Sequence, residues 1–214
     1  MRDVLDRTDV VAILEKLAAD VPAQAETLRE LDAAIGDGDL GITVTLGFGA
    51  VVDALAGLED ADIGQLILRS GMAFNRKAAS TFGALFATMM MRAARIAKGK
   101  DSLDLATIAE MAAVAAQGVR ERGKSDVGDK TLLDALVPAA ESLKASAQEG
   151  IWLTDALQAA AKAAEEGMTA TKALKSRVGR SSWFADRTEG IQDPGATALY
   201  LIIASIAEYV AEGH

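Results

Sequence analysis

Apolar residues recur at spacings of three and four along nearly the whole chain. One such stripe consists of Val10, Leu14, Leu17 and Val21. This period is typical of amphipathic helices that turn one face toward a core. Alternating strand patterns are scarce, and alanine, the residue with the highest helix propensity, is abundant. The pattern predicts eight or nine helices, over residues 8–20, 22–34, 41–57, 62–75, 80–98, 103–121, 130–147, 152–175 and 195–211.

The connections between these helices indicate how they are arranged. Most are short and polar, which favours antiparallel neighbours and an all-α fold, either a helical bundle or a closed helical barrel. Pro22 and Pro194 stand where helices are expected to begin, and Pro138 is expected to bend the helix over 130–147. No internal repeat or domain boundary is visible, so residues 1–214 are expected to form a single domain.

Two connections are longer than simple turns, residues 122–130 and about 176–194. A loop as long as the second is uncommon in a compact helical domain and is often functional.

Composition narrows the classes of partner. The chain has 214 residues, 50% of them hydrophobic, which suffices for one substantial core. Its net charge of −9 disfavours nucleic acid or an anionic membrane surface as a general partner. A phosphorylated small molecule is still a possible ligand if a metal or a local basic group attracts it. The first residues, MRDVLDRTDV, are charged and lack the apolar stretch of a signal peptide, and the apolar segment near LYLIIASIA is short of the roughly 20 residues that span a bilayer. We therefore expect a cytoplasmic protein without a membrane partner.

The residue inventory also limits catalysis. Cysteine is absent, which excludes disulfides, thiolate nucleophiles and zinc–cysteine sites. The single histidine is His214, the last residue. A Ser-His-Asp site, a Cys-His site or a histidine general base is therefore not expected.

The segment IGDGDLG, residues 35–41, has the G-x-G-x-x-G spacing of a dinucleotide-binding turn. That turn requires a strand before it, whereas the preceding segment is patterned as a helix. Carboxylates at Asp37 and Asp39 would also repel a bare pyrophosphate. The dinucleotide interpretation therefore fails on its context.

A cation fits the same segment better. Asp32, Asp37 and Asp39 lie within eight residues, and no Lys or Arg occurs from Glu30 to Leu68. Asp32 is also expected near a helix C-terminus, where its charge opposes the macrodipole. Oxygen ligands favour Mg²⁺, Mn²⁺ or Ca²⁺. The alternative is that Asp37 and Asp39 only cap the helix that follows. If the carboxylates bind a cation, the free N–H groups at the start of the following helix can bind a phosphate beside it. The segment therefore favours a site for a metal–phosphate complex.

Three segments resemble the signature segments of a known family. LDAAIGDGDLG, GDKTLLDALVPAAESL and GRSSWFADRTEGIQDPGAT are similar to those of the nucleotide-binding L subunit of dihydroxyacetone kinase, over about residues 10 to 210. The resemblance implies an antiparallel eight-helix closed barrel that binds ADP or ATP at one end through two Mg²⁺ ions. It implies Asp32, Asp37 and Asp39 as metal ligands. The nucleotide-binding residues that it implies are Leu40, Gly41, Ile42 and Thr43 along the phosphates, Ser80 and Thr81 in a turn, Gly123 and Leu132 at the adenine end, Arg180 from the long loop, and Asp193, Pro194 and Gly195 closing over the nucleotide.

Some positions depart from the family pattern. Leu40 stands where the family commonly has His, and Thr43 where it commonly has Asn. The family's GGASG turn is represented by STFG within residues 79–83. Taken alone, Ser80 is more typical of a helix cap than of a phosphate ligand, and Asp193 followed by Pro194 is a good helix start without any function.

The resemblance implies a kinase subunit that donates a phosphoryl group to a short-chain ketose, dihydroxyacetone or a related ketotetrose, held by a partner K-type subunit. It assigns no catalytic residue to this chain. The phosphoryl source is left open between free ATP and a phosphotransferase-system donor that recharges a resident ADP. One alternative is a non-catalytic metal-ADP-binding module that signals phosphorylation state to a regulatory partner, and another is a helical barrel that carries an apolar ligand. The particular ketose and the formation of a homodimer are also left open.

Overall fold

The computed structural model describes residues 3–213, apart from the side chains of residues 180 and 184. This part of the chain is mostly helical and has no closed sheet, as the all-α prediction requires. Its ten α-helices are α1 Arg7–Ala23, α2 Ala25–Ile35, α3 Leu40–Leu55, α4 Ile63–Lys77, α5 Thr81–Ala97, α6 Leu105–Gly123, α7 Leu133–Glu149, α8 Leu153–Ala170, α9 Ala185–Thr188 and α10 Pro194–Glu212.

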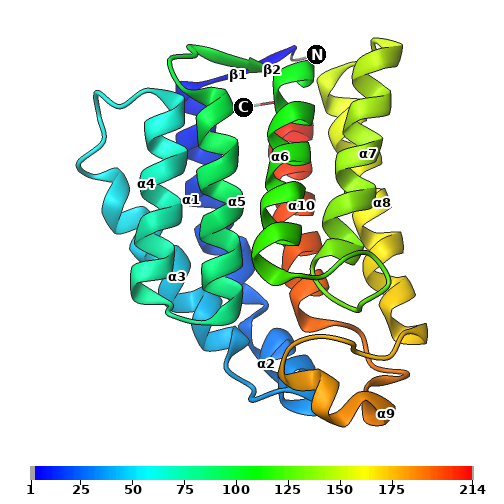
Figure 1. Ribbon diagram of the computed structural model, residues 1–214. Helices are drawn as coiled ribbons and strands as arrows, with labels where there is room; N and C mark the ends of the chain where they lie inside the picture. The colour runs from blue at the N-terminus through cyan, green and yellow to red at the C-terminus, as the bar shows by residue number, and fades with distance from the viewer. Residues whose placement is uncertain (1–2, 214) are drawn as a thin grey trace.

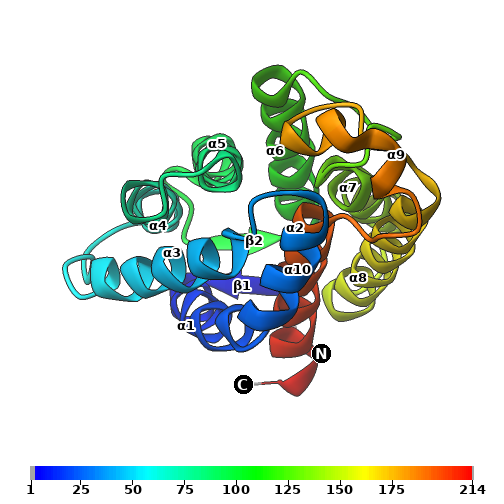
Figure 2. The same cartoon turned by 90° about the horizontal axis from the view of Figure 1, so that it is seen from below.

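Eight long helices pack in a circuit. In order around it, α1 packs on α3, α3 on α4, and so on through α5, α6, α7 and α8 to α10, which packs back on α1. Short connections join most of these neighbours at alternate ends, so adjacent helices run antiparallel (Figure 1). The remaining long helix, α2, lies across one end of the circuit (Figure 2). The starts of α3, α5, α7 and α10 consequently lie at that same end.

The apolar faces of the helices meet inside the circuit. Phe48, Phe74 and Phe86 form an aromatic cluster there, with ring centroids 5.2 Å apart for Phe48 and Phe74 and 4.5 Å apart for Phe74 and Phe86. Gly47 allows this packing, because a Cβ atom at residue 47 would lie 2.4 Å from the Phe74 ring. The interior also holds a cavity of about 240 Å³ lined by apolar side chains, the feature that a carrier of an apolar ligand would need.

Side-chain caps fix where several helices begin. Asp6 and Asp9 form a capping box at α1, in which the Asp6 carboxylate accepts from the Asp9 N–H at 3.0 Å and the Asp9 carboxylate accepts from the Asp6 N–H at 2.9 Å. Such caps satisfy N–H groups that have no partner within the helix. Equivalent side-chain caps are made by Asp62, Ser80, Asp104 and Asp193.

Proline positions were predicted with mixed success. Pro194 begins α10 and Pro138 lies inside α7, as expected, and the bend at Pro138 stays a prediction. The expectation for Pro22 is wrong, since it lies in the last turn of α1 and α2 begins at Ala25. Full burial of Val21 holds that last turn against the core, and near a helix end proline removes only one hydrogen bond.

The predicted pattern also missed or misplaced several short elements. Strands β1 (Val4–Asp6) and β2 (Ser102–Asp104) pair antiparallel, and each is too short to show an alternating pattern. The predicted helix over 152–175 ends at Ala170 and is followed by a 3₁₀ turn, Thr171–Ala173. The long connection is not structureless, because it contains a second 3₁₀ turn, Arg180–Phe184, and helix α9.

Helix α10 is apolar over a greater length than the sequence pattern indicated. Among the described residues it alone has the length and composition that could cross a membrane, with a mean hydropathy of 1.4 over its most apolar window. Half of that window is buried inside the molecule, where α10 packs on α1, α7 and α8. A core helix of a helical bundle has the same character.

Candidate functional site

A pocket of about 220 Å³ opens at the end of the circuit that α2 covers. Helices α3, α5 and α10 all begin at this pocket, so their unpaired N–H groups and the positive ends of their dipoles converge on it. Such a convergence favours an anionic ligand. The lining residues are Asp32, Ile35, Gly36, Asp37, Asp39, Leu40, Ala79, Ser80, Thr81, Phe82, Gly179, Ser181, Asp193, Pro194 and Gly195.

The three predicted metal ligands lie together in this pocket. Asp32, Asp37 and Asp39 each offer one carboxylate oxygen, and these oxygens all lie within 4.8 Å of one another. Burial and the nearby charge of Asp32 raise the pKa of the Asp39 carboxyl, since both disfavour its ionised form. A divalent cation would remove that penalty, and an all-oxygen donor set suits Mg²⁺. The residues present therefore fit a magnesium ion.

The glycines of the IGDGDLG turn bring the carboxylates close to the backbone. A Cβ atom at residue 36 would lie 2.5 Å from Oδ1 of Asp32, so only glycine leaves room for that carboxylate. Gly38 has a φ of +74°, a conformation that glycine adopts without strain. The N–H of Leu40 donates to Oδ2 of Asp32 at 3.1 Å and orients it. These glycines serve a carboxylate cluster rather than a pyrophosphate turn.

Asp39 does not act as a simple cap. It occupies the N-cap position of α3, yet its side chain makes no capping hydrogen bond there. The interpretation of this aspartate as only a helix cap is therefore wrong, and its carboxylate is directed to the acidic cluster instead.

The first turn of α3 places its residues in different directions. Leu40 lines the pocket, but Gly41, Ile42 and Thr43 are not among the lining residues. Gly41 faces α2, where a Cβ atom would lie 2.2 Å from the carbonyl oxygen of Ala25. The Ile42 side chain is 60% exposed and Thr43 is buried. If these three residues contact a phosphate, they would therefore do so through their backbone N–H groups at the start of α3.

The turn between α4 and α5 contributes Ser80 and Thr81 to the lining. The Ser80 hydroxyl caps α5, since its Oγ accepts from the N–H of Gly83 at 3.0 Å. Gly83 is needed for this close turn, because a Cβ atom there would lie 2.1 Å from the Ala78 carbonyl oxygen. The capping interpretation of Ser80 is confirmed, and the residue still faces the pocket.

The start of α10 forms another wall. Asp193 caps the helix by accepting from the Ala196 N–H at 2.7 Å, and Pro194 and Gly195 also line the pocket. Burial raises the pKa of the Asp193 carboxyl to about 7, although the hydrogen bond from Ala196 opposes the shift. Its carboxylate therefore serves the helix start rather than the acidic cluster.

Gly123 and Leu132 are not brought to the pocket lining. Leu132 is buried behind Gly195, where a Cβ atom on the glycine would lie 3.6 Å from that of Leu132. Gly123 ends α6. The side chain of Arg180 lies outside the described residues, while its neighbours Gly179 and Ser181 do line the pocket.

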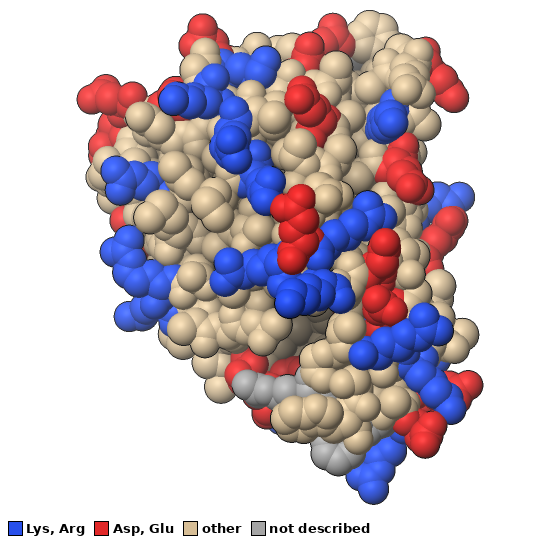
Figure 3. Space-filling view, viewed as in Figure 1, with Lys and Arg blue, Asp and Glu red and all other residues tan. Residues whose placement is uncertain are grey.

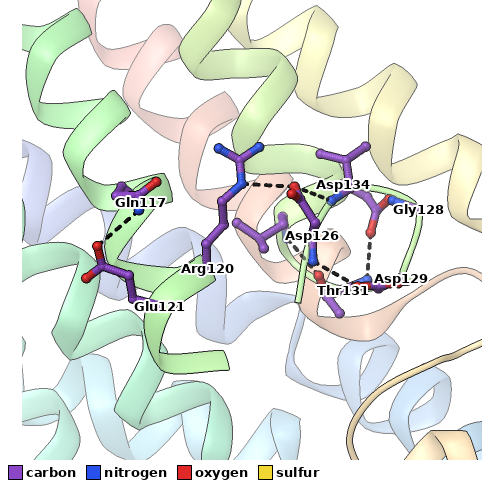
Figure 4. Close-up of polar contacts among 10 residues, drawn as sticks. Gln117, Arg120, Glu121, Asp126, Gly128, Asp129, Thr131 and Asp134 are labelled. Atoms are coloured by element: carbon purple, nitrogen blue, oxygen red, sulfur yellow. Dashed lines mark hydrogen bonds and ion pairs between the residues drawn. The ribbon is translucent and has the colours of Figure 1, made fainter. Parts of the chain in front are cut away.

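Sequence reasoning missed the polar network that holds the loop over 124–132. The Asp134 carboxylate accepts from the N–H groups of Gly128 and Thr131 at 2.7 Å each, and Asp129 accepts from the Asp126 N–H at 2.8 Å (Figure 4). Lys130, from the same loop, is fully buried. The signal that could have found it is a lysine enclosed in the signature segment GDKTLLDAL, directly before an apolar run.

Charge is distributed unevenly over the surface. Residues 69–124 contain ten Lys and Arg residues and four Asp and Glu residues, although the whole chain carries a net charge of −9. Figure 3 shows these basic side chains over the face formed by α4, α5 and α6. This face reduces the repulsion that the net charge would impose on an approaching anion.

Comparison of this sequence with known proteins finds a matching family and several similar proteins. Residues 34–208 match the DAK2 domain. The chain is 36% identical over 203 residues to the ADP-binding subunit DhaL of PEP-dependent dihydroxyacetone kinase from Escherichia coli K12. The aligned region covers 95% of this chain and 97% of that subunit. It is 32% identical over 197 residues to the triokinase/FMN cyclase of Homo sapiens, covering 92% of this chain and 34% of that protein.

Solved structures agree with the sequence relationships. The native crystal structure of the C. freundii dihydroxyacetone kinase matches with a TM-score of 0.74 and 26% identity, over 95% of this chain. A structure of the C. freundii enzyme with AMP-PNP and Mg²⁺ matches in fold with a TM-score of 0.73. The chain spans 35% of the length of that enzyme. The match over most of its length shows that this chain belongs to the DAK2 domain family.

Proposed function

We propose that this chain is the nucleotide- and magnesium-binding subunit of a dihydroxyacetone-type kinase. It forms a single cytoplasmic domain in which the circuit of eight helices is the closed barrel of the family. The observation that carries the proposal is the cluster of Asp32, Asp37 and Asp39 in a pocket where three helices begin. The names of its relatives support it, since the E. coli relative is an ADP-binding subunit and a fold neighbour holds AMP-PNP and Mg²⁺.

In this proposal the carboxylates of Asp32, Asp37 and Asp39 would hold Mg²⁺, two ions in all, beside the phosphates of ADP or ATP. Bound metal neutralises phosphate charge and orients the transferring group. The chain itself supplies the acidic cluster, the N–H groups at the starts of α3 and α5, and Arg180 from the long connection. The remaining nucleotide-binding assignments from the sequence belong to the same proposal.

The acceptor is a short-chain ketose, dihydroxyacetone or a ketotetrose, on a partner K-type subunit. Transfer to a hydroxyl needs an acceptor held in line and a group that takes its proton. The chain has no cysteine, its one histidine is the last residue, and its clustered aspartates would be engaged by metal. The partner would supply these groups by docking over the pocket end.

The names of the relatives bear on the choice of phosphoryl source in this proposal. The E. coli and Listeria innocua subunits are named PEP-dependent, which favours a phosphotransferase-system donor that recharges ADP in place over free ATP. The rate at which radiolabelled ADP exchanges into the protein distinguishes a recharged resident ADP from free ATP as the phosphoryl source. A resident nucleotide exchanges slowly compared with turnover, whereas a free-ATP enzyme exchanges its nucleotide once in every cycle.

A second candidate function is a non-catalytic metal-ADP module that reports phosphorylation state to a regulatory partner. It is favoured by Leu40, a buried apolar side chain at the pocket where the family resemblance leads one to expect His. Such a module would bind Mg-ADP as tightly as a kinase subunit but would not support turnover with any K-type subunit.

The experiment that tests the proposal is reconstitution. The chain alone with Mg-ATP and dihydroxyacetone should give background turnover, and addition of a cognate K-type subunit with the phosphoryl donor should start it. Robust activity of the chain alone would show that the acceptor site is on this molecule. Nucleotide binding without turnover in any reconstituted mixture would favour the signalling module.

A further inference from the structure

Lys130 is the one fully buried cation among the described side chains, with 1% of its surface exposed. It lies in the loop over 124–132 and has a φ of +61°, a left-handed conformation that side-chain-bearing residues rarely adopt. Burial of an ammonium group and a left-handed backbone are both unfavourable unless the surroundings compensate them. The residue is therefore held in place by specific contacts.

Those contacts are three backbone carbonyl groups. The Lys130 Nζ donates to the carbonyl oxygens of Leu174 at 3.0 Å and Ile191 at 2.6 Å, and also to that of Thr188. An ammonium group has three hydrogens, so all its donors are used on one segment of chain. We call residues 174–191 the strap. Because Leu174 and Ile191 are its two ends, a single side chain joins both of them.

The strap covers the candidate site. Its residues Gly179 and Ser181 line the pocket, and its short helix α9 lies against α2. The base of the strap is also closed by the N–H of Ser176, which donates to the Thr188 Oγ1 at 3.0 Å. The ammonium of Lys130 thus lies at the point where the strap leaves the body of the molecule and returns to it.

The loop that presents Lys130 is itself fixed. Asp134, at the start of α7, binds the loop N–H groups on either side of Lys130 (Figure 4). The Arg177 N–H donates to the Asp129 carbonyl oxygen at 3.2 Å, a second link between loop and strap. Burial lowers the pKa of Lys130, and the nearby charges of Asp193, Glu189 and Asp134 oppose that shift. The loop is therefore a rigid support from which the lysine reaches the strap.

We infer that Lys130 is a positioning residue that clasps the strap over the pocket and thereby slows release of the bound nucleotide. The inference rests on the proposed nucleotide-binding function. Without the ammonium, three carbonyl groups, of which that of Thr188 is buried, lose this donor, and the two ends of the strap are no longer joined. The strap then opens more often, which speeds dissociation while leaving the pocket and the acidic cluster unchanged.

The test compares Lys130→Met with a matched control, Lys172→Met, in the full chain. Lys172 is an exposed lysine just before the strap, so the control loses the same charge at the surface. Hydrogen exchange of the nucleotide-free proteins should show faster exchange over residues 175–190 in Lys130→Met only. Stopped-flow measurements with a fluorescent ADP analogue and Mg²⁺ should show dissociation faster by about tenfold or more, with association changed less than about twofold.

Each outcome decides a separate point. Unchanged exchange in the strap of Lys130→Met would overturn the clasp. Faster exchange with an unchanged dissociation rate would overturn its role in holding nucleotide. If wild type binds no Mg-ADP but the exchange difference is present, the proposed function fails and the clasp stands.

A second variant guards against loss of folding. Should Lys130→Met not unfold cooperatively, Thr188→Val removes the hydroxyl that accepts from Ser176 at the same closure without touching the lysine. It should change strap exchange and nucleotide dissociation in the same directions by smaller factors. No change in either quantity would overturn the inference.

Discussion

Asp193 should make the stability of this protein depend on pH in the direction opposite to that of most carboxylates. The carboxyl is buried at the start of α10, and its pKa is raised from 3.8 to about 7, chiefly by burial. The folded state therefore binds the proton more tightly than the unfolded state does. The contribution of this group to stability is fully present below about pH 4 and is lost as the pH rises toward 7.

The size of the effect follows from the two pKa values. Between 3.8 and about 7, at roughly 1.4 kcal/mol for each pH unit, the contribution amounts to about 4 kcal/mol. Asp193→Asn removes the titration and retains a side-chain oxygen that can cap α10, because asparagine is as good an N-cap as aspartate. The difference between wild type and the variant therefore isolates the ionisation of this carboxyl.

The assay is urea unfolding of both proteins, free of metal and nucleotide, at intervals from pH 4 to pH 8. The free energy of unfolding of wild type should fall relative to that of Asp193→Asn as the pH rises, by up to about 4 kcal/mol. Asp186→Asn is the control, since Lys175 lowers the pKa of that exposed carboxyl and the sign of its pH dependence is opposite. Parallel curves for wild type and Asp193→Asn would refute the reasoning.

Two further predictions follow from the packing and from the strap. Gly47→Ala should destabilise the protein by about 1–3 kcal/mol in urea unfolding, because the added Cβ would lie 2.4 Å from the Phe74 ring. Gly49→Ala, on the same helix with open space around it, should be neutral or stabilising, and equal effects of the two would contradict the packing argument. Addition of Mg-ADP to wild type should increase hydrogen-exchange protection over residues 176–190, and equal exchange with and without ligand would mean that the strap does not contact the nucleotide.

The helices were predictable because their apolar period is local information. The three-residue strands were not, since Val4–Asp6 pairs with Ser102–Asp104 through contacts that no short window of sequence contains. The prediction that a helix begins at Pro22 was wrong for a related reason. Burial of Val21 decides whether the preceding helix continues, and burial is a property of the whole fold. Helix starts marked by Asp or Ser were more predictable, since a cap depends on only four residues.

The candidate site was partly predictable in the same sense. Asp32, Asp37 and Asp39 were identifiable because they lie within eight residues and lack neighbouring cations. These aspartates share one pocket with Ser80 and Gly195 because the circuit of helices brings distant segments together. Only the family resemblance allowed that shared site to be predicted from the sequence. Lys130 was missed because its partners, Leu174, Thr188 and Ile191, are backbone carbonyls from a distant segment and leave no trace in residue identity.

The central claim is that the three clustered aspartates hold a metal–nucleotide complex. Its most direct test is calorimetric titration with Mg-ADP of wild type, Asp37→Asn, Asp39→Asn and the exposed control Asp53→Asn, each with and without a chelator. Wild type and Asp53→Asn should bind alike and lose binding with the chelator, while each of the other variants should bind at least about tenfold more weakly, a difference of about 1.4 kcal/mol. Unchanged affinity in both Asp37→Asn and Asp39→Asn, or binding that ignores the chelator, would contradict the account.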